Sequence, residues 1–390
     1  MQQKGAISVL VAPLDWGLGH ATRCIPIIKQ LIEQGSRVFI AASGSQKVLL
    51  KQEFPNLEFL DLPGYGINYK PGFLLKWGLV FQIPAILRQI KKENKWLDEI
   101  RQQYSIDAVI SDNRYGLYNK TLFCIFITHQ LFIQSGSLSE WSWRNTAIGR
   151  WIDRKILLWN YSFINRFSFC WIPDQEGEFS IAGLLSHPPL LPKIPVRYIG
   201  LLSRFQPPEK RGEKNLLLIL LSGPEPQRTQ FEKILFRQLA QTNLETLVLC
   251  GLPGQDRQIP FIKTGIEIRN HATTEEVSNM INESAYIIAR AGYSTIMDLI
   301  RMKKNAILVP TPGQTEQEYL GYYLHEKKWM YTIPQKNFSL LSAIKAFQNA
   351  QLKLPEISES NLEFEVERLL KEVAERKYMN RNADAKSVLH

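Results

Sequence analysis

The feature that most constrains the fold is an alternation of strand-like and helix-like segments. It runs through the chain in two successive series. The first series ends near residue 200, and the alternation restarts after a charged stretch that contains Pro207 and Pro208. Strands that alternate with helices form parallel sheets with right-handed crossovers. The sequence therefore predicts an α/β protein with two Rossmann-like domains whose parallel sheets face a cleft. Strands are expected at 6–13, 37–42, 57–60, 108–111, 123–127, 169–172 and 198–200, then at 216–221, 246–250, 267–269, 285–289 and 306–309.

These segments set the predicted domain boundaries. Residues 1–204 form the N-terminal domain, 205–214 read as a linker because of the two prolines and alternating charges, and 215–377 form the C-terminal domain. Residues 378–390 are polar and are expected to be a loose tail. A chain of 390 residues with 45% hydrophobic residues can build two cores. Long helices are expected at 21–34, 81–103, 139–170, 229–241 and 362–377.

Composition narrows the class of protein. The four cysteines lie far apart and form no CxxC pair, so neither a zinc site nor a disulfide framework is indicated. The chain enters its first strand without a signal-peptide pattern, and no apolar stretch reaches the roughly 18 residues that a membrane span needs. We therefore expect a cytoplasmic protein.

Positive charge and tryptophan are concentrated in one region. The net charge is +10, and residues 60–170 contain 14 Lys or Arg against 8 Asp or Glu, together with six of the nine tryptophans. A basic, aromatic surface suits nucleic acid or an anionic membrane. No known nucleic-acid module is present, so we expect no nucleic-acid partner. Peripheral contact with the inner face of the membrane is the favoured interpretation, and buried packing between helices is the alternative.

The segment 14–20, LDWGLGH, follows the first strand and opens the first helix. Gly17 and Gly19 allow close approach of a ligand to the backbone, and a helix N-terminus favours negative charge. Thr22 replaces the third glycine of the dinucleotide fingerprint, and no acid ends the second strand, which argues against a nicotinamide dehydrogenase. His20 is a candidate general base, because its ordinary pKa is near neutral. The alternative is a histidine that only bonds backbone at the helix start.

A charged cluster ends a buried strand of the first half. Asp112, Asn113 and Arg114 follow the apolar run 108–111, and His129 ends the next strand. The cluster is expected on the acceptor side of the cleft, where Asp112 is an alternative to His20 as the base. A local ion pair between Asp112 and Arg114 is the simpler reading.

The second half places polar residues at two neighbouring strand ends. The run 285–289 is followed by Arg290 and Gly292 and then by a helix that carries Asp298, and the run 306–309 leads to Gln317 and Glu318. In open α/β sheets this edge binds ligands. Arg290 either pairs with an acid or points into the cleft.

Three segments, 17–20, 290–298 and 310–319, resemble in order and spacing the GT-B glycosyltransferases. The closest resemblance is to the family of the peptidoglycan enzyme that moves N-acetylglucosamine from UDP to a lipid-linked sugar. The resemblance implies a UDP-sugar on the second domain, a lipid-linked or glycan acceptor on the first, and direct displacement with inversion. It implies no cofactor and no metal.

The resemblance also implies roles for single residues. Asp298 stands where the family has a glutamate that binds the ribose hydroxyls. Gln317 and Glu318 match two residues that hold the transferred sugar, although the second is an acid here. Gly292 would let the phosphates approach the helix N-terminus, and Arg204 matches an arginine that faces the diphosphate.

Two further donor contacts follow from the same resemblance. Ser222 and Gly223 lie in the loop that meets phosphate in the family, although Pro224 and Pro226 remove two amide donors. His271 lies where the family's backbone recognises uracil. Two other functions stay open: a UDP-sugar 2-epimerase, and a nucleotide-sugar-binding protein without catalysis. The choice between His20 and Asp112 as base also stays open.

Overall fold

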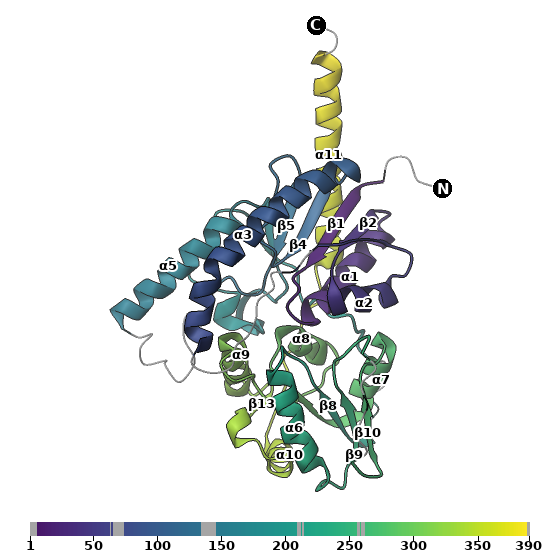
Figure 1. Cartoon of the computed structure of the whole chain (residues 1–390), viewed down its shortest axis with the longest axis vertical. Coiled ribbons are helices and arrows are strands. Elements are labelled where there is room, and N and C mark those ends of the chain that lie inside the picture. The colour runs from purple at the N-terminus through teal and green to yellow at the C-terminus, as the bar shows by residue number, and fades with distance from the viewer. Residues whose placement is uncertain are drawn as a thin grey trace.

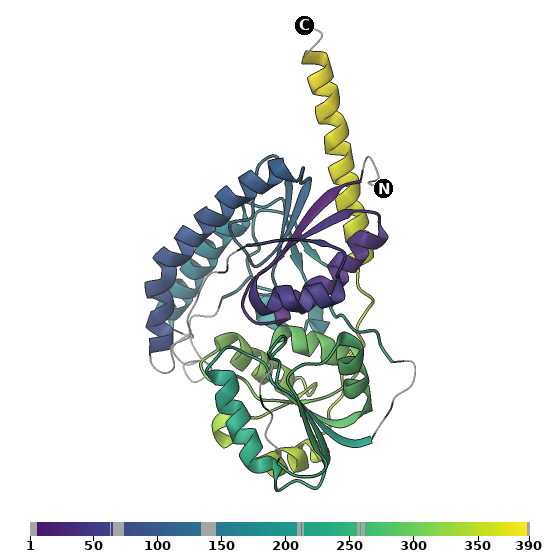
Figure 2. The same cartoon turned by 45° about the vertical axis from the view of Figure 1, so that its right-hand side comes forward.

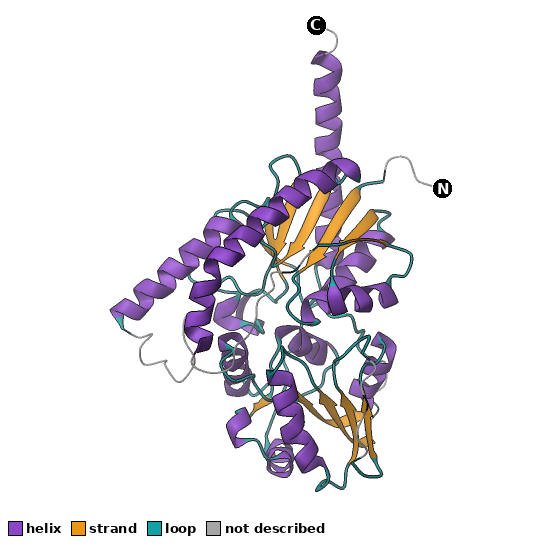
Figure 3. Ribbon diagram, viewed as in Figure 1, coloured by secondary structure: helices purple, strands orange, loops and turns teal. Residues whose placement is uncertain are grey.

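The chain folds into two lobes that each hold one sheet between layers of helices (Figures 1 and 3). The computed structural model describes residues 6–62, 64, 74–133, 146–208, 212, 214–255, 258 and 262–387. Every strand pair in both sheets is parallel, so the predicted class, α/β with two parallel-sheet domains, is confirmed.

The N-terminal sheet has the strand order β3-β2-β1-β4-β5-β6-β7. Its strands are β1 (Ser8–Pro13), β2 (Arg37–Ala41), β3 (Glu58–Leu60), β4 (Ala108–Asp112), β5 (Phe123–Ile127), β6 (Phe169–Ile172) and β7 (Val196–Tyr198). The helices of this lobe are α1 (Gly19–Glu33), α2 (Gly44–Glu53), α3 (Leu74–Gln103) and α5 (Ala147–Ile164). All seven predicted strands of this half are present.

Alternate residues of β1 serve two separate cores. Val9 and Val11 pack into a core with α1 and α2, whereas Leu10 and Ala12 pack into a core with α3 and α5. Successive side chains of a strand point to opposite faces of the sheet. The continuous apolar runs in the sequence therefore arise because both faces of the parallel sheet are covered.

The C-terminal sheet has the order β10-β9-β8-β11-β12-β13. Its strands are β8 (Lys214–Leu220), β9 (Glu245–Leu249), β10 (Ile266–Arg269), β11 (Ser284–Ala289), β12 (Ile307–Leu308) and β13 (Tyr331–Thr332). Its helices are α6 (Gln227–Leu239), α7 (Thr274–Glu283), α8 (Tyr293–Arg301), α9 (Thr315–Glu326) and α10 (Leu340–Asn349). The α7–α9 face of this sheet belongs to the same apolar core as α1, so the core is continuous across the two domains.

The last helix corrects the predicted domain division. α11 (Leu362–Ser387) packs against α1, and Arg197 at the edge of the N-terminal sheet pairs with Glu365 (3.0 Å) and Glu372 (3.3 Å) on it. Figures 1 and 2 show α11 running along the upper lobe and extending beyond it. Residues 362–377 therefore lie with the N-terminal domain, and the predicted loose tail is helical as far as Ser387. The predicted linker lies partly outside the described residues.

α3 and α5 lie side by side along one edge of the upper lobe in both views (Figures 1 and 2). α3 begins at Leu74, before the predicted start at residue 81. Part of the helix expected at 139–170, with Trp141 and Trp143, lies outside the described residues. Within the described part of the chain, no helix combines the length and the apolar character needed to cross a bilayer.

Candidate active site

A cavity of about 1270 Å³ lies between the two domains and is lined from both. The loop after β1 and the start of α1 form one wall, and the loops after β8, β9 and β10 with the starts of α8 and α9 form the other. These are the carboxyl ends of parallel strands, where open α/β sheets bind ligands. The predicted site residues that line the cavity are Gly17, Gly19, His20, Asn113, Arg204, Ser222, Gly223, His271, Gly292, Asp298 and Gln317.

His20 and Asp112, predicted as alternative bases, form one unit. The register between β1 and β4 pairs Pro13 with Asp112, which brings this carboxylate to the start of α1. Nδ1 of His20 lies 3.0 Å from Oδ2 of Asp112. The Asp112 side chain is fully buried, whereas His20 lines the cavity. Only His20 can therefore meet a ligand directly.

Arg23, one turn after His20 on α1, was not singled out in the sequence. Its Nε donates to Oδ2 of Asp112 at 2.8 Å, and its Nη2 donates to Oδ1. Burial would raise the pKa of Asp112, but Arg23 and His20 outweigh it and hold that pKa at about 2. Burial and Arg23 lower the pKa of His20, against the opposing effect of Asp112. Asp112 is therefore ionised, and His20 is neutral at pH 7.

A histidine and an acid connect this group to the other domain. His129, after β5, places Nδ1 3.1 Å from Nη1 of Arg23 and Nε2 2.8 Å from Oε1 of Glu316 on α9. Its ring stacks on Tyr293 of α8, with ring centroids 4.0 Å apart. Glu316 precedes the predicted Gln317, but nothing in the sequence linked it to His129. The side chains of His20, Arg23, His129 and Glu316 thus meet at the domain boundary.

Asp298 lines the cavity from the C-terminal domain. It lies beyond the first turn of α8, so it does not cap this helix. Its Oδ1 accepts a hydrogen bond from Ser203 at 2.6 Å. Burial raises the pKa of Asp298 to about 6, although Arg204 and Ser203 favour the ionised form. A carboxylate in this position can accept two hydrogen bonds from a diol.

Arg204 lies beside Asp298 and donates to Oγ1 of Thr274 at 3.1 Å. Burial lowers the pKa of Arg204, and Asp298 opposes this effect. Its Nε is buried and has no hydrogen-bond partner within the described part of the chain. The guanidinium thus keeps a donor for a further acceptor.

The loop after β8 and the start of α8 supply backbone to the cavity. Gly223 has a positive φ of 106°, which favours glycine, and Gly292 is the N-cap residue of α8 with no contact at its missing side chain. Arg228, which also lines the cavity, is engaged with Glu225 (2.7 Å) and Glu232 (2.8 Å). The backbone amides at the N-terminus of α8 are therefore better placed than Arg228 to donate to an anionic ligand.

Gln317 and Glu318 differ in their surroundings. Gln317 lines the cavity and accepts a hydrogen bond from the Thr311 amide at 3.0 Å. Glu318 accepts from the Gly313 amide at 2.9 Å and is not among the lining residues. The structure therefore brings Gln317 to the site and gives Glu318 a role in holding the loop before α9.

Arg290 and Arg114 lie away from the cavity, which corrects their predicted roles. Arg290 donates to the carbonyls of Val309 (3.1 Å) and Gln227 (3.0 Å), and burial lowers its pKa to about 9. Arg114 is fully buried and pairs with Glu93 at 2.8 Å, not with Asp112. Both arginines hold chain segments together, since a buried charge needs such partners.

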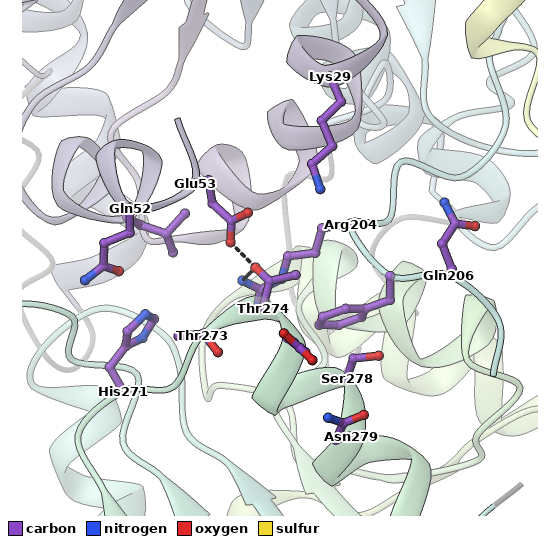
Figure 4. Close-up of a pocket in the computed structure, with 13 residues that line it drawn as sticks. Lys29, Gln52, Glu53, Arg204, Gln206, His271, Thr273, Thr274, Ser278 and Asn279 are labelled. Carbon is purple, nitrogen blue, oxygen red and sulfur yellow. Dashed lines mark hydrogen bonds between the residues drawn. The ribbon is translucent and has the colours of Figure 1, made fainter. Parts of the chain in front are cut away.

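A second, polar pocket of about 540 Å³ adjoins the cavity at the domain boundary. Figure 4 shows Lys29 and Glu53 of the N-terminal domain facing Thr274 of α7, with a hydrogen bond from Thr274 to Glu53. Arg204 and His271 line both spaces. Burial, followed by Arg204, lowers the pKa of His271. His271 is therefore neutral at the junction of the two spaces.

Comparison with known proteins agrees with this architecture. Solved structures of similar fold include the glycotransferase of kitacinnamycin (12% identity, TM-score 0.60, 98% of this chain and 99% of that chain) and the glycosyltransferase SnogD from Streptomyces nogalater (15%, 0.54, 95% and 96%). The calicheamicin glycosyltransferase CalG4 gives 12% identity and a TM-score of 0.57 over 98% of both chains. The fold is GT-B.

The sequence comparisons point to the same class of protein. Residues 227–373 match the model of the glycosyltransferase family 28 C-terminal domain. An uncharacterised glycosyltransferase of Methanosarcina acetivorans is 25% identical over 316 residues, which cover 77% of this chain and 79% of that protein. The family model and this relative both support a glycosyltransferase.

Proposed function

We propose that this chain is an inverting glycosyltransferase that moves a sugar from UDP to the hydroxyl group of a lipid-linked acceptor. The observation that carries the proposal is that His20, held by buried Asp112, and Asp298 line one cavity from opposite domains. One wall then offers a general base, and the other offers a carboxylate that can accept hydrogen bonds from a ribose diol. This combination suits the transfer of a sugar between two substrates.

The donor is assigned to the C-terminal wall. Asp298 would accept hydrogen bonds from the ribose hydroxyls, the amides at the start of α8 would bind the diphosphate, and Arg204 would offer its unused donor to it. Gln317 would contact the sugar, which we take to be an N-acetylhexosamine from the family resemblance. The backbone beside His271 would contact the uracil ring, as the family resemblance implies.

Apolar side chains on the N-terminal wall support a lipid-linked acceptor rather than a glycan. Ile86 and Ile90 of α3 and Trp159 and Phe163 of α5 line this part of the cavity. Apolar lining favours a ligand with an apolar part, because burying such surfaces releases water.

The reaction needs one base and one leaving group. The acceptor hydroxyl would transfer its proton to Nε2 of His20 while its oxygen attacks the anomeric carbon, and the bond from that carbon to the diphosphate oxygen would break. Asp112 would stabilise the imidazolium that forms. The amides and dipole of α8 and Arg204 would stabilise the departing UDP.

The outer face of α5 supports contact with the inner face of the plasma membrane. Ile148 and Trp151 are 66% and 60% exposed, and Arg154 and Lys155 are exposed beside them. Apolar and basic side chains on one helix face suit an anionic lipid surface. This surface would bring the acceptor's lipid to the part of the cavity that α3 and α5 line.

Thermal unfolding with UDP, GDP, UDP-N-acetylglucosamine and NAD tests the donor assignment. We expect uridine nucleotides alone to stabilise the wild type, by about 2.7 kcal/mol at 100 times the Kd, and Asp298→Ala to lose this effect. An unchanged uridine response in Asp298→Ala would contradict the donor site. Mass and NMR analysis of UDP-N-acetylglucosamine after incubation then separates three functions. Transfer gives UDP and a glycosylated lipid, epimerisation gives a changed epimer ratio without an acceptor, and binding alone leaves the nucleotide sugar unchanged.

A further inference from the structure

A chain of hydrogen bonds crosses from the C-terminal domain to the buried carboxylate behind His20. Oε1 of Glu316 lies 2.8 Å from Nε2 of His129, and Nδ1 of His129 lies 3.1 Å from Nη1 of Arg23. Arg23 in turn donates to both oxygens of Asp112. Each step joins a different element, so the chain is complete only while α9 lies against the N-terminal domain.

The donors in this chain fix the tautomer of His129. A guanidinium has only donors, so Nδ1 of His129 must accept from Arg23 and carries no proton. Its Nε2 then carries the proton and donates to Glu316. Without an acceptor at Glu316, only the contact with Arg23 would favour that tautomer, and Nε2–H would lose its partner.

Arg23 also contacts His20 in a way that competes with Asp112. Nδ1 of His20 lies 3.0 Å from Oδ2 of Asp112 and 2.9 Å from Nη2 of Arg23. A single ring nitrogen cannot donate to the first and accept from the second at once. If Nδ1–H donates to Asp112, Nε2 is free to accept a proton; if Nδ1 accepts from Arg23, Nε2 is protonated and cannot act as a base.

We propose that Glu316, through His129 and Arg23, is a positioning residue that keeps His20 in the tautomer with a basic Nε2. Glu316 holds His129 as an acceptor, His129 holds Nη1 of Arg23, and the guanidinium stays on Asp112 instead of turning to His20. His20 is then ready for catalysis only when the donor domain is in place. The catalytic meaning of this tautomer rests on the proposed function, whereas the chain of contacts does not.

The charges around His20 agree with this arrangement. The charged and titratable groups that interact with it are Asp112 from β4, Arg23 from α1, His129 after β5 and Glu316 from α9. Burial and Arg23 lower the pKa of His20, so the ring is neutral near pH 7, as a base must be. Loss of the Arg23 charge therefore raises this pKa.

Nitrogen-15 NMR of the histidine rings tests the proposal without a known acceptor. The signals of His20 are assigned with His20→Gln, and its tautomer and titration are measured in the wild type, Glu316→Gln and Glu316→Met. Glutamine keeps an acceptor for His129, whereas methionine does not. Glu326→Gln on the exposed end of α9 is the matched control. We expect Nδ1–H of His20 in the wild type, Glu316→Gln and the control, and a shift toward Nε2–H in Glu316→Met.

The Glu316 variants carry less risk of misfolding than a variant of Arg23. Arg23→Met leaves Asp112 buried without its cation and risks unfolding, whereas the Glu316 side chain is 31% exposed and tolerates substitution. Where Arg23→Met folds, the pKa of His20 should rise above its value in the wild type, because the nearby positive charge is gone.

The outcomes separate the two proposals. An unchanged His20 tautomer and titration in Glu316→Met would overturn the positioning role. A changed tautomer supports it even if no sugar transfer is found, in which case only the proposed function fails. Where transfer is found, kcat should fall in Glu316→Met and recover in Glu316→Gln, with little change in KM for UDP-N-acetylglucosamine.

Discussion

At the scale of single residues, Asp298 illustrates a buried carboxylate at the cavity that destabilises the folded protein. Its pKa is raised by burial to about 6 from an ordinary value of 3.8. Between these two values the folded state holds a proton that the unfolded state has lost, so stability falls as the pH rises from about 4 to 6 and stays reduced above it. The cost at pH 8 is at most about 3 kcal/mol.

Asp298→Asn should therefore stabilise the free protein at pH 8 and leave its stability at pH 4 nearly unchanged. Asparagine still accepts from Ser203 but carries no charge to desolvate. Urea unfolding of both proteins at pH 4, 6 and 8 measures the difference, and the same variant should bind UDP more weakly. Equal stability of the two proteins at pH 8 would show that the Asp298 pKa is not raised.

The His20–Asp112 pair allows a second residue-scale prediction. His20→Gln should lower kcat by roughly 10²–10⁴-fold, the usual contribution of a general base, and keep stabilisation by UDP. Asp112→Asn should lower kcat similarly and also reduce the melting temperature, because it leaves Arg23 buried without its counter-charge. Kinetic and thermal measurements on both variants test this difference. A fully active His20→Gln would exclude His20 as the base.

The sequence could identify these residues only where local pattern carries the information. His20 and Asp112 stand out because each follows a predicted strand at the ligand-binding edge. Arg23 lies inside a helix of ordinary pattern, and its burial depends on β4, some 90 residues away. His129 and Glu316 are 187 positions apart, and their contact exists only after both domains have folded. Arg290 and Arg114 also follow strands, but local pattern does not reveal the groups they bond, which are the Val309 and Gln227 carbonyls and Glu93.

At the scale of elements, α11 joins the end of the chain to the first domain. Leu369 is 1% exposed in the shared core, whereas Phe364 on the same helix is 61% exposed. Leu369→Ala should cost about 2–5 kcal/mol of unfolding free energy, and Phe364→Ala should cost little. Urea denaturation of the full chain measures both. Similar costs for the two variants would contradict the packing of this helix.

α5 offers a test of the proposed membrane contact. Trp151→Ser and Ile148→Ser should weaken binding to vesicles with anionic lipid and leave the melting temperature nearly unchanged, because both side chains are exposed. Leu190→Ser, also on the surface at 45% exposure, is the control. Vesicle sedimentation at low and high salt separates the apolar and charged contributions. Undiminished binding in the two α5 variants would remove this helix from the proposed surface.

Elements were predictable where periodicity decides them. Every predicted strand appeared, because strands buried on both faces read as continuous apolar runs. α2, with little amphipathic character, was not predicted, and the placement of α11 was wrong because sequence order does not reveal which domain a terminal helix packs against.

At the scale of the whole molecule, the two domains touch beside the cavity. Ser294 of α8 donates to the Gly19 carbonyl at 2.8 Å, and Tyr319 and Tyr323 of α9 bond Leu184 (2.9 Å) and Ser180 (2.9 Å) of the N-terminal domain. Contact between two domains can exclude water from a site between them. Contacts at Gly19 should therefore control activity as well as shape.

Gly19→Ala should disturb the contact between the domains. A Cβ at Gly19 would lie 2.9 Å from Oγ and 3.3 Å from Cβ of Ser294, so the Ser294 side chain must turn or α8 must shift by a few tenths of an ångström. We expect a lower melting temperature and a reduced kcat, because the hydrogen bond from Ser294 to the Gly19 carbonyl is disturbed and misplaced groups slow catalysis. The double variant Gly19→Ala/Ser294→Gly removes both contacting atoms and should restore part of the activity. If the double variant stays as slow as Gly19→Ala, the clash with Ser294 does not explain the effect, and Gly19 is needed for its close approach to the ligand instead.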